Sequence, residues 1–230
     1  MVATLACPAR TAARCRRALT SIGIMSLAAC AAPAVSRSAP TGDTLLLLAP
    51  DPASDAVHAD DTEDSLVARY GAAYVVRGEV DQGEGMLVNG TVLFPDDAMR
   101  RLEIQWQDTV ARRTPVQVNA VGRGWMIAPG IMRGTTLGEL ERMNGAPFEL
   151  TGFRGHYSGT VIDWHTGRLA PLGAEEDGWV VATLRLQPRG PYPEGVSEAR
   201  YATEDGFLSS DPGMQLLQPR VVYMAVHPRE

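Results

Sequence analysis

Lysine is absent from the sequence, because all 21 basic residues among the 230 are arginine. This absence excludes enzymes that form a Schiff base through a lysine, and it excludes the phosphate-binding loop whose lysine follows a run of glycines. Cysteine is scarce as well, and Cys7, Cys15 and Cys30 all lie near the start of the chain. The remainder of the chain therefore has to be stable through its core, without a disulfide.

Residues 1–29 have the features of a signal peptide. They contain no acidic residue and four arginines, followed by an apolar run from Ala18 to Ala29 that is too short to span a bilayer. The run ends in Leu27-Ala28-Ala29-Cys30, which resembles the lipobox of bacterial lipoproteins. In that family the cysteine is acylated and becomes the first mature residue. The alternative is an ordinary secretory signal with an incidental cysteine.

The resemblance implies a subcellular location as well as a membrane anchor. Several acyl chains on Cys30 would make attachment to a membrane effectively permanent, because each buried methylene adds about 0.8 kcal/mol. Ala31 follows the cysteine in place of an aspartate. By resemblance to enterobacterial lipoproteins, this implies the inner leaflet of the outer membrane, with the protein facing the periplasm.

Removal of residues 1–29 leaves 201 residues, with 17 arginines against 27 acidic residues and hence a net charge of −10. This charge disfavours nucleic acid and anionic lipid headgroups as partners. We expect residues 30–55 to form a lipidated N-terminus and flexible tether, because Ala, Pro, Ser and Gly dominate its first part. Within it, Leu45–Leu48 is either an edge strand or a plug on the core.

Two further segments, 56–130 and 131–230, are each predicted to hold one helix followed by strands. The second helix is expected over 137–144, because Thr136 and Glu139 form a capping box and Gly145 and Pro147 stop the helix. A shift of 74 positions places Thr62 on Thr136 and Gly71 on Gly145. This repeated pattern indicates either a tandem duplication or two helices that use the same start and stop signals.

The strands are predicted from alternation and β-propensity. Leu102, Ile104 and Trp106 alternate with polar residues and predict a half-buried strand, with its polar face outward. Met86–Phe94 is either a tight Asn-Gly hairpin or one strand broken by a bulge. Residues 188–219 contain five prolines and are expected to form a long surface excursion. Other strands are expected over 74–80, 116–120, 125–127, 148–153, 159–164, 178–187 and 220–226. The fold class is therefore α+β, with short helices packed on an antiparallel sheet.

The second helix carries a family resemblance. Its motif is similar to the Gly-x-Thr-x-x-Glu-Val-x-x-x-x-Gly-x-Pro helix of small outer-membrane lipoproteins, including one of the β-barrel assembly machinery. It is also similar to the β-lactamase inhibitory proteins, in which such units occur as a tandem pair. The residues that carry the resemblance are Gly134, Thr136, Glu139, Leu140, Gly145 and Pro147. They are structural, so the resemblance implies a fold and assigns no binding residue.

One predicted hairpin, 155–168, contains the residues with the strongest chemical potential. His156, Asp163 and His165 could approach one another there as zinc ligands or as a base with its orienting group. The alternative is a structural or solvated role, since their spacing fits no metal-site signature. Trp164, next to a turn, is the tryptophan expected to be exposed on a contact surface, whereas the other tryptophans fill the space between helices and sheet.

These observations favour a lipid-anchored protein of the cell envelope that acts as a binding or assembly module, without a cofactor or metal. Its expected partners are the membrane, reached through acyl chains on Cys30, and another envelope protein. One alternative is an envelope hydrolase that uses the 155–168 hairpin. A second alternative is a purely structural envelope lipoprotein.

Overall fold

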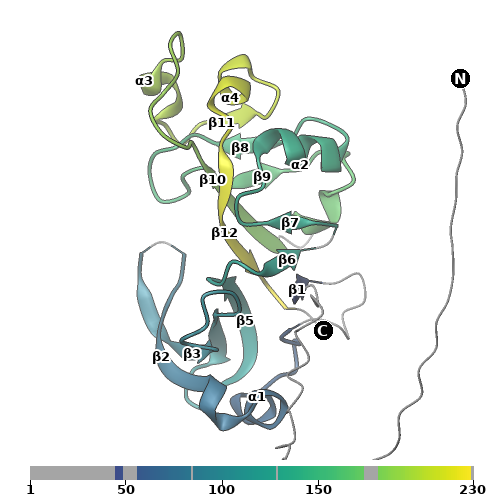
Figure 1. Cartoon of the computed structure of the whole chain (residues 1–230), viewed down its shortest axis with the longest axis vertical. Coiled ribbons are helices and arrows are strands. Elements are labelled where there is room, and N and C mark those ends of the chain that lie inside the picture. Colours follow the sequence, from purple (N-terminus) through teal and green to yellow (C-terminus); the bar gives the residue numbers. More distant parts are fainter. Residues whose placement is uncertain (1–44, 49–55, 84, 128, 174–180, 229–230) are drawn as a thin grey trace, which may run out of the picture. The chain divides into compact units, whose positions relative to one another are not determined.

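The computed structural model describes residues 45–48, 56–83, 85–127, 129–173 and 181–228 (Figure 1). They belong to one compact unit of the chain, which extends from Gly42 to Glu230. The predicted signal peptide and Cys30 lie outside the described residues, and so does most of the predicted tether. No helix in the described ranges is long and apolar enough to cross a membrane.

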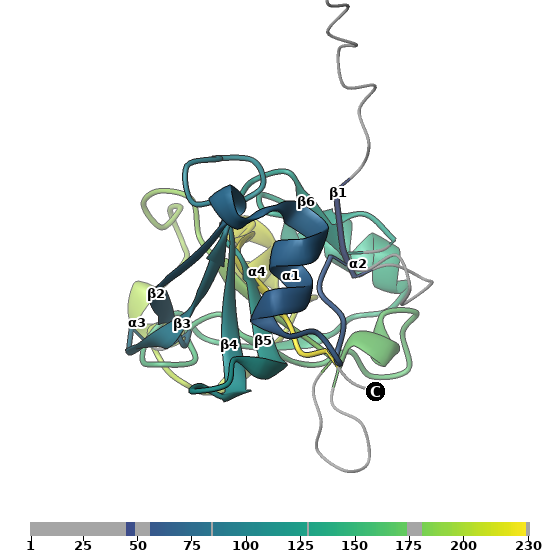
Figure 2. The same cartoon turned by 90° about the horizontal axis from the view of Figure 1, so that it is seen from below.

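The architecture is α+β, as predicted, and is built on a six-stranded antiparallel sheet. The strands lie side by side in the order β10 (Ala182–Gln187), β12 (Arg220–Val226), β5 (Arg113–Ala120), β4 (Leu102–Asp108), β3 (Leu87–Leu93) and β2 (Val75–Asp81). Helix α1 (Glu63–Tyr70) covers one face, where Leu66 joins Leu102 and Ile104 in the core (Figure 2). The bounds of β12 agree with the predicted strand 220–226.

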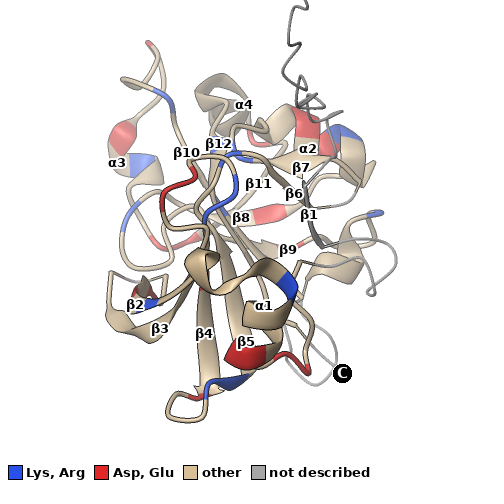
Figure 3. Ribbon diagram, turned by 60° about the horizontal axis from the view of Figure 1, so that its bottom comes forward, with Lys and Arg blue, Asp and Glu red and all other residues tan. Residues whose placement is uncertain are grey.

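Both long helices begin and end at the residues that the sequence indicates. Thr62 caps α1 and Thr136 caps α2 (Leu137–Asn144), each in a capping box, and Gly71 and Gly145 follow the last turns. Gly145 has a positive φ of 75°, which favours glycine. Helix α1 also places its acidic residues in the first turn and Arg69 in the last, where each complements the helix dipole (Figure 3).

Each half begins with a helix that is followed by strands, although the later elements differ between the halves. After α1 and the short helix η2 (Ala72–Tyr74), strands β2 to β5 follow as a meander. After α2 come β8 (Glu149–Thr151) and β9 (Val161–Asp163), then the short helix η3 (Ala170–Leu172), and then β10 and β12. The 74-residue offset holds for both helices and for the starts of two strands in each half, since β2 aligns with β8 and β3 with β9. Whether the halves arose by duplication stays a prediction.

Residues 188–219 are only partly the surface excursion that the prolines suggested, because none of residues 188–200 is buried, whereas the rest of the range includes buried residues. They contain α3 (Glu198–Tyr201), β11 (Gly206–Leu208) and α4 (Pro212–Leu217). Strand β11 pairs with β8 and completes a second sheet of order β11-β8-β9. The prediction fails for residues 201–219, where Tyr201 and Met214 are buried in the core, while the prolines stand between elements or at a helix start.

Two strand predictions also need correction. Met86–Phe94 contains neither a hairpin nor a bulge, because β3 pairs with β2 in continuous register through Gly90. A Cβ at Gly90 would lie 2.4 Å from the Ile104 carbonyl oxygen, so glycine serves a close approach of strands there. Strand β6 (Trp125–Ile127) does not return along β5. It forms a separate sheet with β7 (Ile131–Met132) and, in parallel, with the edge strand β1 (Leu45–Leu48).

Strand β4 was expected to expose its polar face, and this is wrong as well. Leu102, Ile104 and Trp106 lie in the core as predicted, yet Glu103 and Gln105 are also buried. The hairpin end of β2 reaches over them, since Gln105 Nε2 donates to the Asp81 carbonyl at 3.3 Å. Asp81 N donates in turn to a Glu103 carboxylate oxygen at 3.2 Å. The sheet face opposite α1 is therefore partly covered and lined with polar groups.

Candidate functional site

A hollow of about 350 Å³ lies between β9 and β10 and extends onto the polar face of the six-stranded sheet. The two strands approach each other at the bridge between Thr160 and Arg185, although they belong to different sheets. We call this space the β9–β10 hollow. Its polar lining residues are Gln82, Gln117, Tyr157, Thr160, Thr183, Arg185 and Tyr223. Its apolar wall includes Val161, Ile162 and Trp164.

Strand alternation positions the polar side of the hollow. On β10, Ala182, Leu184 and Leu186 face the core, so Thr183 and Arg185 face the other way. Arg185 stands directly opposite Tyr223 of β12. Its guanidinium carbon lies 5.1 Å from the centre of the tyrosine ring, a cation–π contact that holds the cation beside the hollow.

Tyr223 is a hydrogen-bond donor at neutral pH. Burial raises the pKa of its phenol to about 12, although the nearby Arg185 acts in the opposite direction. Its oxygen accepts a hydrogen bond from Gln117 Nε2 at 3.1 Å. The hollow thus holds a protonated phenol next to a guanidinium and an amide.

Two buried polar atoms at the hollow have no hydrogen-bond partner within the described part of the chain. They are Thr160 Oγ1 and Arg185 Nε. The Arg185 Nη1 group donates to the Gly83 carbonyl, but no ion pair with a carboxylate is found for Arg185 among the described residues. Unsatisfied buried polar groups are uncommon in folded proteins, and each one calls for an explanation.

The predicted grouping of His156, Asp163 and His165 is not found. Asp163 and His165 do contact each other, with 3.1 Å between Oδ2 and Nδ1, but both are exposed at the turn after β9. His156 is exposed too, and no hydrogen bond or ion pair within the described ranges joins it to the other two. The described residues hold no cluster of ligands suited to a metal ion. The convergence that a zinc or base role requires does not occur, because His156 lies in the turn before β9 and Asp163 and His165 at its end, all three exposed to solvent. Their exposure agrees with the solvated role, and none of the three lines the hollow.

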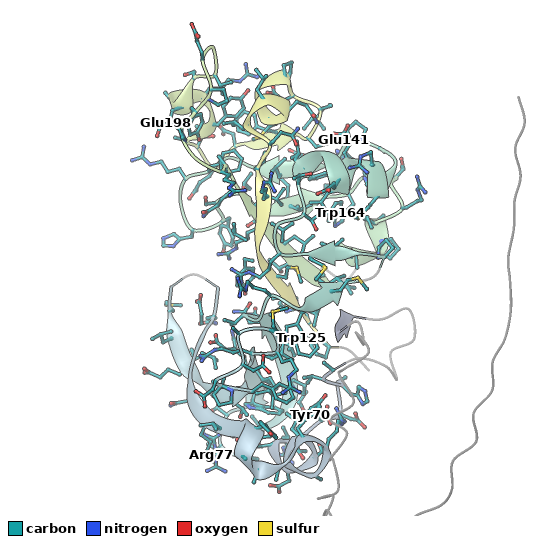
Figure 4. All side chains as sticks on the ribbon, viewed as in Figure 1. Tyr70, Arg77, Trp125, Glu141, Trp164 and Glu198 are labelled. Carbon is teal, nitrogen blue, oxygen red and sulfur yellow. The ribbon has the colours of Figure 1, made fainter. Side chains whose placement is uncertain are left out.

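Trp164 is not exposed, contrary to the prediction. Its side chain is 3% exposed and packs against Phe148, with 4.9 Å between ring centres (Figure 4). The following turn closes around Asn144, which donates to the Trp164 carbonyl, and this directs the indole inward. Trp106 and Trp125 are buried as expected, and Trp179 lies outside the described residues. One part of Trp164 still borders the hollow.

Sequence reasoning missed the main polar residues of the hollow. Gln117, Arg185 and Tyr223 come from three different strands and are separated by as much as 106 positions in the chain. Each stands at an ordinary polar position of a strand pattern. The one available signal was the phase of β10, which places Thr183 and Arg185 on the face opposite the core.

Comparison with known proteins assigns no family. No protein-family model matches the sequence, and no curated protein matches it. Among solved structures, the chain is similar to the uncharacterized protein YfeY from Escherichia coli, with 12% sequence identity. The match covers 74% of this chain and 90% of that chain, with a TM-score of 0.39. A likeness at this level supports no conclusion about fold or function.

Proposed function

We propose that this protein is a lipid-anchored component of the cell envelope that acts by binding a partner in the periplasm. The location in the envelope and the lipid anchor are supported by the arginine-rich start, the short apolar run and the Leu-Ala-Ala-Cys order that ends at Cys30. The binding role is supported by the β9–β10 hollow, which combines a cation, a phenol and amides with an apolar wall. Concave sites of this composition are typical of ligand recognition.

The hollow is the observation that carries the binding role. Most of its lining comes from β5, β9, β10, β12 and the end of the β2–β3 hairpin, and the loops around β9 and after η3 supply the rest, so both halves build it. Strands hold side chains more rigidly than loops do, and a preorganised site loses less entropy on binding.

The hydrolase alternative loses its support from the 155–168 hairpin, since His156 does not join Asp163 and His165 and all three are exposed. Asp163, His165 and His156 remain predicted members of a contact surface beside the hollow. The purely structural alternative makes a different prediction, because it requires no defined partner at the hollow.

The anchor is tested by Cys30→Ala in the full chain. We expect the variant to fold and to leave the membrane fraction for the soluble envelope fraction, because the acyl chains have no other attachment site in the proposal. A variant that still sediments with membranes would contradict the lipid anchor.

The binding role is tested by site-specific photo-crosslinking in living cells. A photoreactive residue replaces Ile162, which lines the hollow and is 47% exposed, and the matched control is Leu208, at 48%. We expect a discrete crosslinked product from position 162 and none from position 208. No product from position 162 would favour the structural alternative.

A further inference from the structure

The hollow contains one cationic group and several groups that can donate hydrogen bonds. Arg185 offers N–H groups, Tyr223 its phenol proton, and Gln117 an amide. None of the described lining residues is acidic, although acidic residues outnumber basic ones in the chain. A lining with a cation and no acidic residue favours an anion, although Asp81 and Glu103 lie close enough to help raise the pKa of Tyr223.

The charge of Arg185 has no anionic partner within the described residues. Two carboxylates of the same sheet region already have other donors: Asp81 accepts from Gly83 N at 2.7 Å, and Glu103 accepts from Arg101 at 2.8 Å. A partly buried cation is costly unless it is paired. An anion bound in the hollow would supply the pair and would give Arg185 Nε the acceptor that it lacks.

Thr160 adds a second unsatisfied group beside the first. Its hydroxyl oxygen Oγ1 is buried without a partner, and its backbone bridges to Arg185. A small shift of the Thr160 side chain toward the hollow breaks no hydrogen bond at Oγ1, whereas a shift of Arg185 has to keep or replace the bond from Nη1 to the Gly83 carbonyl. A carboxylate has two oxygens with about four acceptor sites, which suits two adjacent donors.

The opposite wall of the hollow is apolar. Val161, Ile162 and Trp164 line it, and Ile162 is 47% exposed. An inorganic anion would leave this wall in contact with water, whereas a ligand with an apolar group would cover it.

We propose that the β9–β10 hollow binds a carboxylate with an adjoining apolar group. The proposal deepens the proposed function, since it rests on the same hollow as a binding site and names the chemistry of its ligand. The carboxylate would accept hydrogen bonds from Arg185, Thr160 and Tyr223, and the apolar group would lie against Ile162 and Trp164. Two sources share this chemistry: the free C-terminus of a peptide and a small organic acid.

Isothermal titration calorimetry on the purified full-length lipoprotein in a non-ionic detergent tests the proposal. The probes are N-acetylphenylalanine and N-acetylphenylalaninamide, which differ in the carboxylate alone. We expect the acid to bind at least about tenfold more tightly than the amide, because the amide leaves the Arg185 charge unpaired. Equal affinities, or inorganic phosphate binding as tightly as the acid, would overturn the proposal.

Two variants locate the site. Arg185→Gln should weaken binding of the acid by about tenfold or more, whereas Arg189→Gln, at an exposed arginine outside the hollow, should leave it unchanged. If Arg185→Gln fails to fold, Thr160→Val decides the matter, because it removes the hydroxyl at nearly constant volume and should weaken binding several-fold. Unchanged affinity in whichever of the two variants folds would overturn the proposal.

Two further probes separate the sources. Tighter binding of the tripeptide Ala-Ala-Phe than of 3-phenylpropanoate assigns a peptide C-terminus, and the reverse order assigns a small acid. Failure of this proposal is distinguishable from failure of the proposed function. A crosslinked partner at position 162 without carboxylate binding would overturn the ligand class and leave the binding role standing.

Discussion

Asn144, the last residue of α2, gives the sharpest stability prediction. Its side chain is buried at 1% exposure and makes three hydrogen bonds to backbone groups. It donates to the carbonyls of Ala146 at 2.9 Å and Trp164 at 3.1 Å, and it accepts from Leu169 N at 3.0 Å. One amide therefore ties the end of the helix to the turn that follows β9.

Asn144→Ala removes all three bonds without admitting a substitute. The Leu169 N–H would be left as a buried donor, which costs about 1–3 kcal/mol, and each carbonyl adds roughly 1 kcal/mol. We therefore expect the free energy of unfolding to fall by about 3–5 kcal/mol. That is a large share of the roughly 5–15 kcal/mol typical of a folded domain.

Urea unfolding of the full chain, followed by circular dichroism and carried out in the Cys30→Ala background to avoid detergent, measures this loss. Asn89→Ala is the matched control, because Asn89 is exposed on β3, and its substitution should change the free energy of unfolding by less than about 0.5 kcal/mol. If Asn144→Ala costs less than about 1 kcal/mol, or no more than Asn89→Ala, the inferred role of this amide is refuted.

Three more predictions concern Gly90 in β3, Gly138 in α2 and His227 after β12. Gly90→Ala should destabilise the protein by several kcal/mol, or prevent folding, because the added Cβ would overlap the Ile104 carbonyl. Gly138→Ala within α2 should instead stabilise it by about 0.5–1 kcal/mol, and the same urea assay would contradict both expectations if the order were reversed. His227 contacts Thr183 and the Val116 carbonyl, and burial lowers the pKa of its imidazole below the usual 6.5. The unfolded chain then binds more protons, so stability should fall as the pH drops below about 6.5, by at most about 1.4 kcal/mol per unit from this group. His227→Gln should flatten this part of the pH profile, and an unchanged slope would refute the assignment.

Helix bounds could be predicted because their signals are local. Thr62 and Thr136 start α1 and α2, and Gly71 and Gly145 end them, through bonds that span only a few residues. The core face of β4 followed from alternation for the same reason. The strand signal near Asn89 failed because a glycine that permits close strand contact and one that permits a turn look identical in the sequence.

The candidate site could not be predicted, because its geometry depends on tertiary pairing. Tyr223 meets Arg185 only because β12 pairs with β10 in one particular register. Thr160 meets Arg185 only through the bridge between two sheets. His156, Asp163 and His165 were candidates by residue type, because histidine and aspartate often take part in catalysis. Their positions depend on exposed turns, which the sequence pattern does not reveal.

The proposed role depends most directly on Cys30. Mass spectrometry of the N-terminal peptide of the protein purified from its native membrane tests this dependence. We predict a peptide that begins at Cys30 and carries the added mass of several acyl chains. A peptide that begins before Cys30, or that carries it as an unmodified thiol, would contradict the lipid anchor and remove the main support for a role in the envelope.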